Sequence, residues 1–328
     1  MSVTLADVAA ACGISPSTVS RALSDPDKVN AATRKRVQQV ANRMGYTPSR
    51  AARSLSIGRT GTIGLIVPDI ANPFFPPLIK TVQSRATARA NAVLLADTDE
   101  HVADELPRAR AMRKDVDGLI MVSPRTSEAR MEELIQLGPI VFVNRQVPGA
   151  TCVTIESANG INDAIEHLSA LGHRNICYLN GPRRSWSNAQ RHKAIRAACK
   201  SRGVELTEFG PFEAQVQAGV RAADLVLASD ATAVLAYDDL IALGVMGRIA
   251  ERGLRVGHDV SVIGIDDSPM SSVMYPTLTS IHVPNAEAGA LAVDLLLDLL
   301  EGVEGVDPDE TELETHLVIR GSTGPVPA

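Results

Sequence analysis

The sequence of 328 residues lacks the signals of most chemistries that a chain of this length could carry. Its four cysteines, at positions 12, 152, 177 and 199, show neither metal-ligand spacing nor the pairing of a disulfide framework, so we expect reduced, mostly buried thiols. No run reaches the ~18 apolar residues that a membrane span needs. The opening stretch MSVTLADVAA lacks the charged start and the apolar core of a secretory signal. These absences lead us to expect a cytoplasmic protein with no membrane partner.

Catalytic and cofactor motifs are lacking as well. No segment that resembles a strand is followed by a phosphate-binding loop or a dinucleotide fingerprint, and VIGIDDS does not have the glycine spacing for a pyrophosphate. The seven histidines show no metal-ligand spacing, and no set of serine, histidine and aspartate stands out as a triad. We therefore expect that the protein is not an enzyme and that it uses neither a cofactor nor a metal.

Charge is present, but it is unevenly distributed. The net charge of the whole chain is −6, yet residues 1–60 contain nine lysines and arginines against three aspartates, a net charge of +6. The remainder therefore carries a net charge of −12. A basic segment on an acidic body indicates that the first sixty residues contact a polyanion and that the rest does not.

Three short helices are predicted within the first 45 residues. Thr4 can cap the first, Asp7 suits its dipole, and Gly13 can end it in a left-handed conformation. Ser15 can then cap a second helix, with Pro16 at its first position. Two short helices joined by a glycine-containing turn of three to four residues form the helix-turn-helix pattern.

The second helix has an apolar face and a polar face. The spacing places three apolar side chains toward the core and three polar ones outside, respectively Val19, Ala22 and Leu23, and Ser17, Ser20 and Arg21. A third helix, capped by Asn30 and ended by Gly45, presents the basic run RKR at positions 34–36. A plain helical bundle with a solvated polar face is the alternative, but the net charge and the glycine turn favour DNA binding.

From Thr62 onward, short β-branched apolar runs alternate with amphipathic segments. The runs are TIGLIVP, AVLLAD, DGLIMVS, PIVFVN, NICYLN, AVLAY and DVSVIGID, and the predicted helices span 79–90, 159–171, 187–201, 238–252 and 285–300. Such alternation indicates parallel sheets covered by helices. About nine strands are expected, which predicts an α/β fold of two doubly wound parallel-sheet lobes behind an N-terminal all-α domain.

Polar side chains follow several of the predicted strands. Individually such residues are more typical of helix caps and surface turns, but their recurrence at carboxyl ends, where α/β sheets bind ligands, indicates a binding site. Carboxylates, amides and an arginine beside an aromatic ring suit a small polyhydroxylated molecule. The residues are Asn72, Phe74, Phe75, Asn144, Arg145, Ser187, Arg191, Asp238, Asp239, Asp266 and Asp267.

The stretches VTLADVAAACGISPSTVSRAL and KVNAATRKRVQQVANRMGYTPSRAARSL resemble the DNA-binding headpiece of the LacI/GalR family of transcriptional repressors. The resemblance implies that 15–23 is the recognition helix, laid in the major groove. It also implies that Arg21 makes a bidentate contact to guanine, while the hydroxyls of Thr18 and Ser20 contact phosphates. The implied DNA contacts of the headpiece are Thr4, Ser15, Pro16, Ser17, Thr18, Ser20, Arg21 and Asn30.

The stretch TPSRAARSLSIGRTG predicts a short helix over 50–55. It is far below the ~12–15 residues that an isolated helix needs in water, so it should form only with a partner. A plain interdomain linker is the alternative. The resemblance matches this segment to the family's hinge helix, which implies that Arg50 and Arg53 lie near phosphates and that Leu55 wedges between base steps in the minor groove.

The rest of the chain resembles the effector domain of the same family, which is similar to periplasmic sugar-binding proteins. The resemblance rests on NPFF, LGHRNICYLNGP, YDDLIALG, GLRVGHDVSVIGIDDS and YPTLTSI. It implies that Arg191 and Asp266 grip the hydroxyls of a sugar or polyol and that one of two phenylalanines stacks on its ring. The implied effector-binding residues are Phe74, Phe75, Asn144, Trp186, Arg191, Phe212, Asp238 and Asp266.

Together these predictions describe a homodimeric repressor that binds a pseudopalindromic operator and is released by a small-molecule effector. The expected domains are a headpiece over 1–45, a hinge over 46–60 and an effector-binding and dimerisation domain over 61–328. Within the effector-binding and dimerisation domain, one lobe is expected at about 61–156 with 284–310, and the other at about 157–283 with 311–325. The alternative, a solute-binding protein of the periplasmic type without regulatory DNA binding, would need a secretory signal and no basic helical arm.

Overall fold

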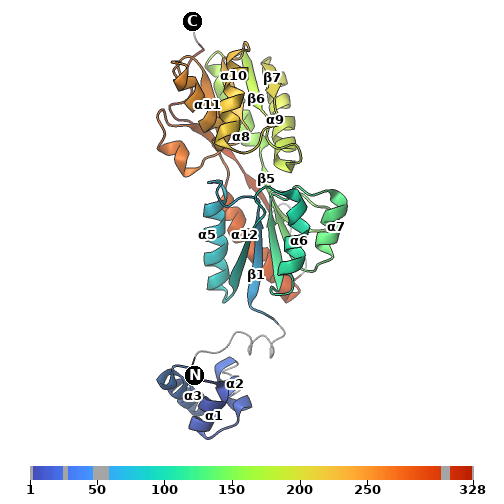
Figure 1. The fold of residues 1–328 in the computed structure, drawn as a ribbon, viewed down its shortest axis with the longest axis vertical. Helices are drawn as coiled ribbons and strands as arrows, with labels where there is room; N and C mark the ends of the chain where they lie inside the picture. Colours follow the sequence, from blue (N-terminus) through green and yellow to red (C-terminus); the bar gives the residue numbers. More distant parts are fainter. Residues whose placement is uncertain (1–2, 25–28, 47–58, 304–310, 327–328) are drawn as a thin grey trace. The chain divides into compact units, whose positions relative to one another are not determined.

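The computed structural model of the chain describes residues 3–24, 29–46, 59–303 and 311–326 (Figure 1). The chain divides into two compact units, Met1–Gly61 and Thr62–Ala328. Within the described residues, the first unit is helical, and the second is built from two parallel sheets covered by helices. This is the predicted fold class.

Three helices form the first unit, and their inner faces share one small core. They are α1 (Leu5–Cys12), α2 (Pro16–Ser24) and α3 (Ala31–Met44). Val8, Val19 and Val37, one from each helix, are fully buried against one another. Burying such side chains contributes about 1.5–3 kcal/mol each, which is what holds so small a domain together.

The predicted caps of these helices are confirmed. Thr4 and Asp7 form a reciprocal capping box at the start of α1, and Gly13 ends it with a φ of 62°. The amide of Thr18 donates to the Ser15 hydroxyl, 3.2 Å away, at the start of α2. At α3 the Asn30 side chain accepts from the amide of Ala32, and a left-handed glycine again ends the helix. The turn between α1 and α2 is therefore set by local sequence alone.

The first sheet of the second unit has the strand order β11-β5-β4-β3-β1-β2, with every pairing parallel. Its strands are β1 (Thr62–Val67), β2 (Ala92–Asp97), β3 (Gly118–Val122), β4 (Ile140–Val143), β5 (Thr151–Glu156) and β11 (Glu312–Glu314). Helices α5 (Phe75–Ala88) and α12 (Asn285–Glu301) cover one face, and α6 (Val102–Met112) and α7 (Glu128–Ile135) cover the other (Figure 1). We call this part the N-lobe.

The second sheet has the order β12-β10-β9-β8-β6-β7, in which only the β10–β12 pairing is antiparallel. Its strands are β6 (Asn175–Leu179), β7 (Glu205–Phe209), β8 (Ala233–Ala236), β9 (Ser261–Asp266), β10 (Thr279–His282) and β12 (His316–Val318). Two helix pairs cover it, α8 (Ala158–Ala170) with α9 (Trp186–Arg202), and α10 (Val216–Leu227) with α11 (Asp239–Glu251). We call this part the C-lobe.

The chain passes between the lobes three times, after β5, after β10 and after β11. The last passage lies later than expected, because 312–314 pair with β5 and so belong to the N-lobe rather than to the C-lobe. The described residues also contain twelve strands rather than about nine. Two of the additional strands, β11 and β12, have three residues each, too few to show any periodic pattern in the sequence.

Candidate DNA-binding face and effector site

The exposed face of α2 carries hydroxyls and one guanidinium, as its spacing predicts. Val19 and Ala22 face the core, whereas Ser17 and Arg21 are exposed. The Ser15 hydroxyl lies 2.9 Å from that of Ser17. The Nε of Arg21 donates to the carbonyl of Ser17, which leaves its two terminal nitrogens at the surface of the helix. A recognition helix needs an exposed donor group of this kind to reach base edges.

Three of the predicted DNA contacts, Thr4, Ser15 and Asn30, are already used as helix caps. The hydroxyl of Thr4 both donates to Asp7 at 2.7 Å and accepts from its amide. The side-chain oxygen of Asn30 accepts from the amide of Ala32 at 2.9 Å, which leaves its amide nitrogen for another partner. The three predicted hinge residues, Arg50, Arg53 and Leu55, lie outside the described residues.

A small cavity lies where the carboxyl ends of strands from both sheets meet, and we call it the inner chamber. Its volume is about 30 Å³, room for one or two water molecules. Its lining residues are Asn72, Phe74, Phe75, Glu100, Ser123, Arg125, Asn144, Ser187, Arg191, Ala214, Tyr237, Asp238 and Asp266. Six of the eight predicted effector-binding residues are among them.

Four lining residues have a left-handed backbone conformation, which side chains rarely adopt; one is Glu100 (φ 59°), and the other three lie at strand ends. Ser123 (φ 46°) directly follows β3, Asn144 (φ 55°) follows β4, and Asp266 (φ 121°) ends β9. The amide nitrogen of the Asn144 side chain donates to the Ser123 hydroxyl at 3.0 Å. Backbone strain of this kind concentrates at binding sites, where surrounding packing holds it in place.

Arg191 is held rigidly at the bottom of the inner chamber. It sits on α9, is almost completely buried, and donates from Nη1 to the Tyr237 carbonyl at 2.6 Å. Its Nη2 lies 3.5 Å from the Asp266 carboxylate, and its guanidinium stacks 4.8 Å above the centre of the Tyr237 ring. Burial opposes its charge, but Tyr237 and Asp266 outweigh this cost, and the pKa of Arg191 is raised.

Burial also shifts the pKa values of the carboxyl groups in the inner chamber. Desolvation raises the pKa of Asp238 to about 7, against the amide of Ile241 and the nearby arginines, which favour the charged form. Desolvation likewise raises the pKa of Asp266 well above its usual range, although Arg191 opposes the shift. Desolvation therefore disfavours the ionised form of both carboxyls, whereas a ligand that donates hydrogen bonds would favour it.

Two buried polar atoms of the inner chamber have no hydrogen-bond partner among the described residues. They are Oδ2 of Asp238 and Nε of Arg191, an acceptor and a donor. Both side chains are less than 5% exposed, so bulk water does not satisfy these atoms. Leaving such a group unsatisfied costs about 1–3 kcal/mol, and a hydroxylated ligand that pairs with both would recover this cost.

The neighbouring Asp239 has a structural role instead. Its carboxylate accepts hydrogen bonds from the amide of Ser268 and from the hydroxyls of Ser271 and Ser280, at 2.6–2.7 Å. These bonds tie the start of α11 to the loop after β9. Asp267 is also engaged elsewhere, in an ion pair with Arg320.

Two predicted ligand residues lie outside the lining of the inner chamber. Trp186 precedes Ser187 on α9, and a rotation of about 100° per residue turns its ring into a separate cavity beside Gln190. Phe212 packs against the core of the C-lobe, with its amide bonded to the Asn180 carbonyl. The lining of the inner chamber also lacks Arg145, which faces α7.

Sequence reasoning missed two charged residues of the inner chamber, Glu100 and Arg125. Arg125 follows β3 on a loop fixed by Glu105, whose buried carboxylate accepts the amides of Arg125 and Thr126 at 2.8 Å each. The Arg125 guanidinium is paired with Glu100 and lies close to Tyr237. Neither residue belongs to a periodic pattern, so only the fold brings them together.

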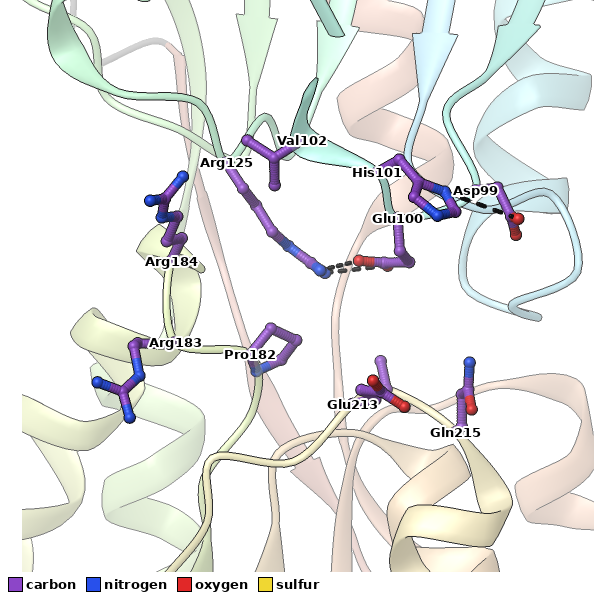
Figure 2. A pocket seen from close by; sticks show the side chains of 11 residues that line it. Asp99, Glu100, His101, Val102, Arg125, Pro182, Arg183, Arg184, Glu213 and Gln215 are labelled. Atoms are coloured by element: carbon purple, nitrogen blue, oxygen red, sulfur yellow. Dashed lines mark hydrogen bonds and ion pairs between the residues drawn. The ribbon is translucent and has the colours of Figure 1, made fainter. Parts of the chain in front are cut away.

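Arg125 and Glu100 also line a larger cavity of about 570 Å³ between the lobes, which we call the outer chamber. Figure 2 shows the Arg125 side chain extending from the N-lobe into this space, with Glu213 and Gln215 of the C-lobe facing it. The remaining lining residues are Asp99, His101, Val102, Pro182, Arg183, Arg184 and Ala214. The two chambers therefore share Glu100, Arg125 and Ala214 in their linings.

The described residues hold neither a metal-binding cluster nor a membrane-spanning helix. They contain no group of three or more histidines, cysteines, aspartates or glutamates placed to hold a metal ion. Among the helices that the structure describes, none is long and apolar enough to cross a membrane.

Comparison with known proteins identifies both parts of the chain. The family described as bacterial regulatory proteins, lacI family, matches residues 4–49, and a periplasmic binding protein-like domain matches 165–323. Catabolite control protein A of Priestia megaterium is 32% identical over 335 residues, 98% of this chain and 100% of that protein. The chain belongs to the LacI family of transcriptional regulators.

Solved structures of the LacI family agree with this assignment. A lac repressor dimer bound to operator and the anti-inducer ONPF superposes with a TM-score of 0.88 at 28% identity, covering 99% of this chain and 100% of the other. A LacI-family regulator of Enterococcus faecium with bound ribose gives 0.71 at 28% identity, covering 80% and 99%. These relatives are regulators rather than enzymes, and a solute-binding protein would not account for the match over 4–49.

Proposed function

We propose that this LacI-family protein is a homodimeric repressor that binds a pseudopalindromic operator and is released from it by a sugar or polyol bound in the inner chamber. The observation that carries the proposal is the pair of unpartnered buried atoms on Asp238 and Arg191. They lie at the carboxyl ends of the strands, where α/β sheets bind ligands. The basic headpiece supplies the second half of the argument, because it has the charge and the exposed helix that DNA binding needs.

The expected ligand class follows from the lining of the chamber. Asp238 and Asp266 accept hydrogen bonds, Arg191 and Asn144 donate them, and aromatic rings contribute apolar surface. Small-molecule sites combine a few convergent polar groups with aromatic and apolar walls in this way. The regulator of Enterococcus faecium with bound ribose supports a sugar-like ligand in this family.

Exposed apolar side chains support dimer formation. The edge strand β2 carries Leu94 and Leu95, which are 40% and 37% exposed, and an unpaired apolar edge invites association. In the C-lobe, Val273 and Tyr275 are 74% and 98% exposed in the loop before β10. We propose that these two surfaces pair with their own copies across a two-fold axis, which would also place two headpieces on two half-sites.

The effector is expected to weaken operator binding. A chamber of about 30 Å³ has no room for a sugar, so binding requires the lobes or the lining side chains to move. A ligand shifts such an equilibrium only by its difference in affinity for the two arrangements. We propose that the liganded arrangement is incompatible with the paired hinge segments that the operator complex requires.

Operator binding by the full chain is the test. A duplex selected by the chain from a random-sequence pool should be bound with an affinity that falls steeply with salt, because phosphate contacts release counterions. Arg21→Ala should weaken this binding by about 1–3 kcal/mol and reduce the preference over random DNA. Arg43→Ala is the control, because it removes the same charge from the last turn of α3. The absence of salt-dependent binding by the intact chain would contradict the proposal.

A further inference from the structure

Besides Arg191, the inner chamber is lined by a second cationic group, the guanidinium of Arg125. This side chain starts on the N-lobe loop after β3 and is only 11% exposed. It is paired with Glu100 and lies close to Tyr237 and Asp238 of the C-lobe. Arg125 therefore lines both the inner and the outer chamber.

The inner chamber is too small for a ligand while Arg125 is in place, and there is space for its side chain nearby. With Arg125 in place, the inner chamber offers about 30 Å³, whereas ligand sites usually offer ~300–1,000 Å³. The outer chamber offers about 570 Å³ directly beside it and is lined by Asp99 and Glu213 as well as Glu100. Arg125 can therefore move outward without losing acidic partners.

The charges of the inner chamber do not balance once Arg125 has left. Arg191 is paired with Asp266, while Asp238 has only the amide of Ile241 on its Oδ1. Its other oxygen, Oδ2, has no partner among the described residues. A neutral ligand that displaced Arg125 would leave the Asp238 and Asp266 carboxyls facing one guanidinium, so that one of the two must keep a proton, whereas a cationic ligand would let both ionise.

We propose that the effector of this chain is a hydroxylated amine, such as an amino sugar or an amino polyol, whose ammonium group displaces the Arg125 guanidinium and is bound by Asp238. The ammonium group restores the charge that Arg125 removes, and its N–H groups satisfy Oδ2 of Asp238. A ring or chain hydroxyl accepts from the free Nε of Arg191. Phe74, Phe75 and Tyr237 line the same space, and aromatic rings favour cationic ligands.

This inference rests on the proposed function, because it concerns the same chamber, but it makes a separate claim about the charge of the ligand. Operator binding without any ligand tests the function, whereas the preference for an amine over its uncharged analogue tests the inference. A chain that binds operator and is released equally well by neutral sugars would retain the function and overturn the inference.

The experiment measures ligand binding to the full chain with matched pairs that differ by one amine. The pairs are glucosamine and glucose, glucamine and sorbitol, and ethanolamine and ethylene glycol, at constant ionic strength and pH 7. Because Arg125 competes with the ligand, Arg125→Ala should bind each amine at least about tenfold more tightly than the natural chain does. In that variant the amine of each pair should also bind at least about tenfold more tightly than its uncharged partner. Thermal stabilisation by added ligand is a suitable readout.

Further variants test which residues cause the preference for amines. Arg125→Gln keeps bulk and hydrogen-bonding capacity without the charge, and should show the same preference for amines. Arg183→Ala removes an exposed arginine of the outer chamber only, and should change nothing. Asp238→Asn added to Arg125→Ala should abolish the preference, while its side-chain oxygen still caps α11. Equal binding of both members of each pair, a preference that survives Asp238→Asn, or no binding to either Arg125 variant would overturn the inference.

Discussion

The two carboxyl oxygens of Asp238 have different surroundings. Oδ1 accepts the amide of Ile241 at 2.8 Å and so caps α11. Oδ2 faces the inner chamber without a partner among the described residues. The side chain is 2% exposed, and this burial raises its pKa to about 7. Local helix formation therefore holds a poorly solvated carboxyl group in the lining of the inner chamber.

The raised pKa of Asp238 predicts a pH dependence of stability. In the unfolded chain this carboxyl ionises near pH 4, whereas in the folded chain it holds its proton up to about pH 7. The folded state thus binds more protons between these values, and its stability falls as pH rises through that range. Asp238→Asn removes the titration and keeps a capping oxygen.

We expect the melting temperature of the natural chain to fall more between pH 5 and pH 8 than that of Asp238→Asn. The buried carboxyls of Asp239 and Asp266, whose pKa values are also raised, remain in both proteins, so their contributions largely cancel in the comparison. Scanning calorimetry across this range checks the difference. Identical pH profiles for the two proteins would show that Asp238 is ionised throughout.

Much of the site at this scale was predictable from the sequence, and what was missed has a physical reason. Asn144, Asp238 and Asp266 follow buried strands, and parallel strands place their carboxyl ends together. Arg125 follows β3 in the same way, but only the packing of the lobes turns its side chain toward Asp238. Trp186 lines a separate cavity, unlike its neighbour Ser187, because consecutive residues on a helix face different directions.

At the scale of elements, α10 and α11 pack through a pair of glycines. A Cβ on Gly244 would lie 2.0 Å from the Val216 carbonyl oxygen, and one on Gly219 would lie 2.1 Å from that of Ile241. The two backbones therefore approach more closely than side chains would allow. Because α11 begins beside Asp238, this contact also determines where the chamber carboxylate lies.

We expect Gly244→Ala to destabilise the protein by about 1–3 kcal/mol, as overpacking of buried contacts usually does. Gly247→Ala on the same helix is the matched control, because a Cβ there meets nothing within 4 Å. Replacing an exposed helical glycine by alanine should stabilise the protein by about 0.5–1 kcal/mol. Urea denaturation of both variants measures the difference, and equal effects of the same sign would contradict this account of the helix pair.

The elements that the sequence predicts well are those with strong local signals. The caps of α1, α2 and α3 follow directly from residues such as Thr4, Ser15 and Asn30. The start of α5 was placed four residues late, because Pro76 and Pro77 interrupt the helical pattern although proline is tolerated in a first turn. Strand β7, with its alternating and partly exposed ELTEF, has too little apolar character to be recognised.

At the scale of the whole molecule, the two parts of the chain carry opposite net charges. The first sixty residues carry +6 and the rest −12, so attraction for DNA is concentrated in the headpiece and its hinge. We propose that the acidic second unit repels phosphates and binds the effector between its two lobes. Its inner chamber is filled by its own side chains, so that ligand binding and rearrangement of the lobes are linked.

The central claim is that occupancy of the inner chamber controls operator affinity, and one titration tests it most directly. The full chain, bound to a fluorescent operator duplex, is titrated with ribose, cellobiose, sorbitol, glucosamine and glucamine while anisotropy reports release. We expect at least one of these ligands to release the natural chain. Arg191→Ala should bind the operator with unchanged affinity and remain bound throughout the same titration, because the ligand loses its fixed guanidinium. Release of Arg191→Ala at the same ligand concentration as the natural chain would contradict the account.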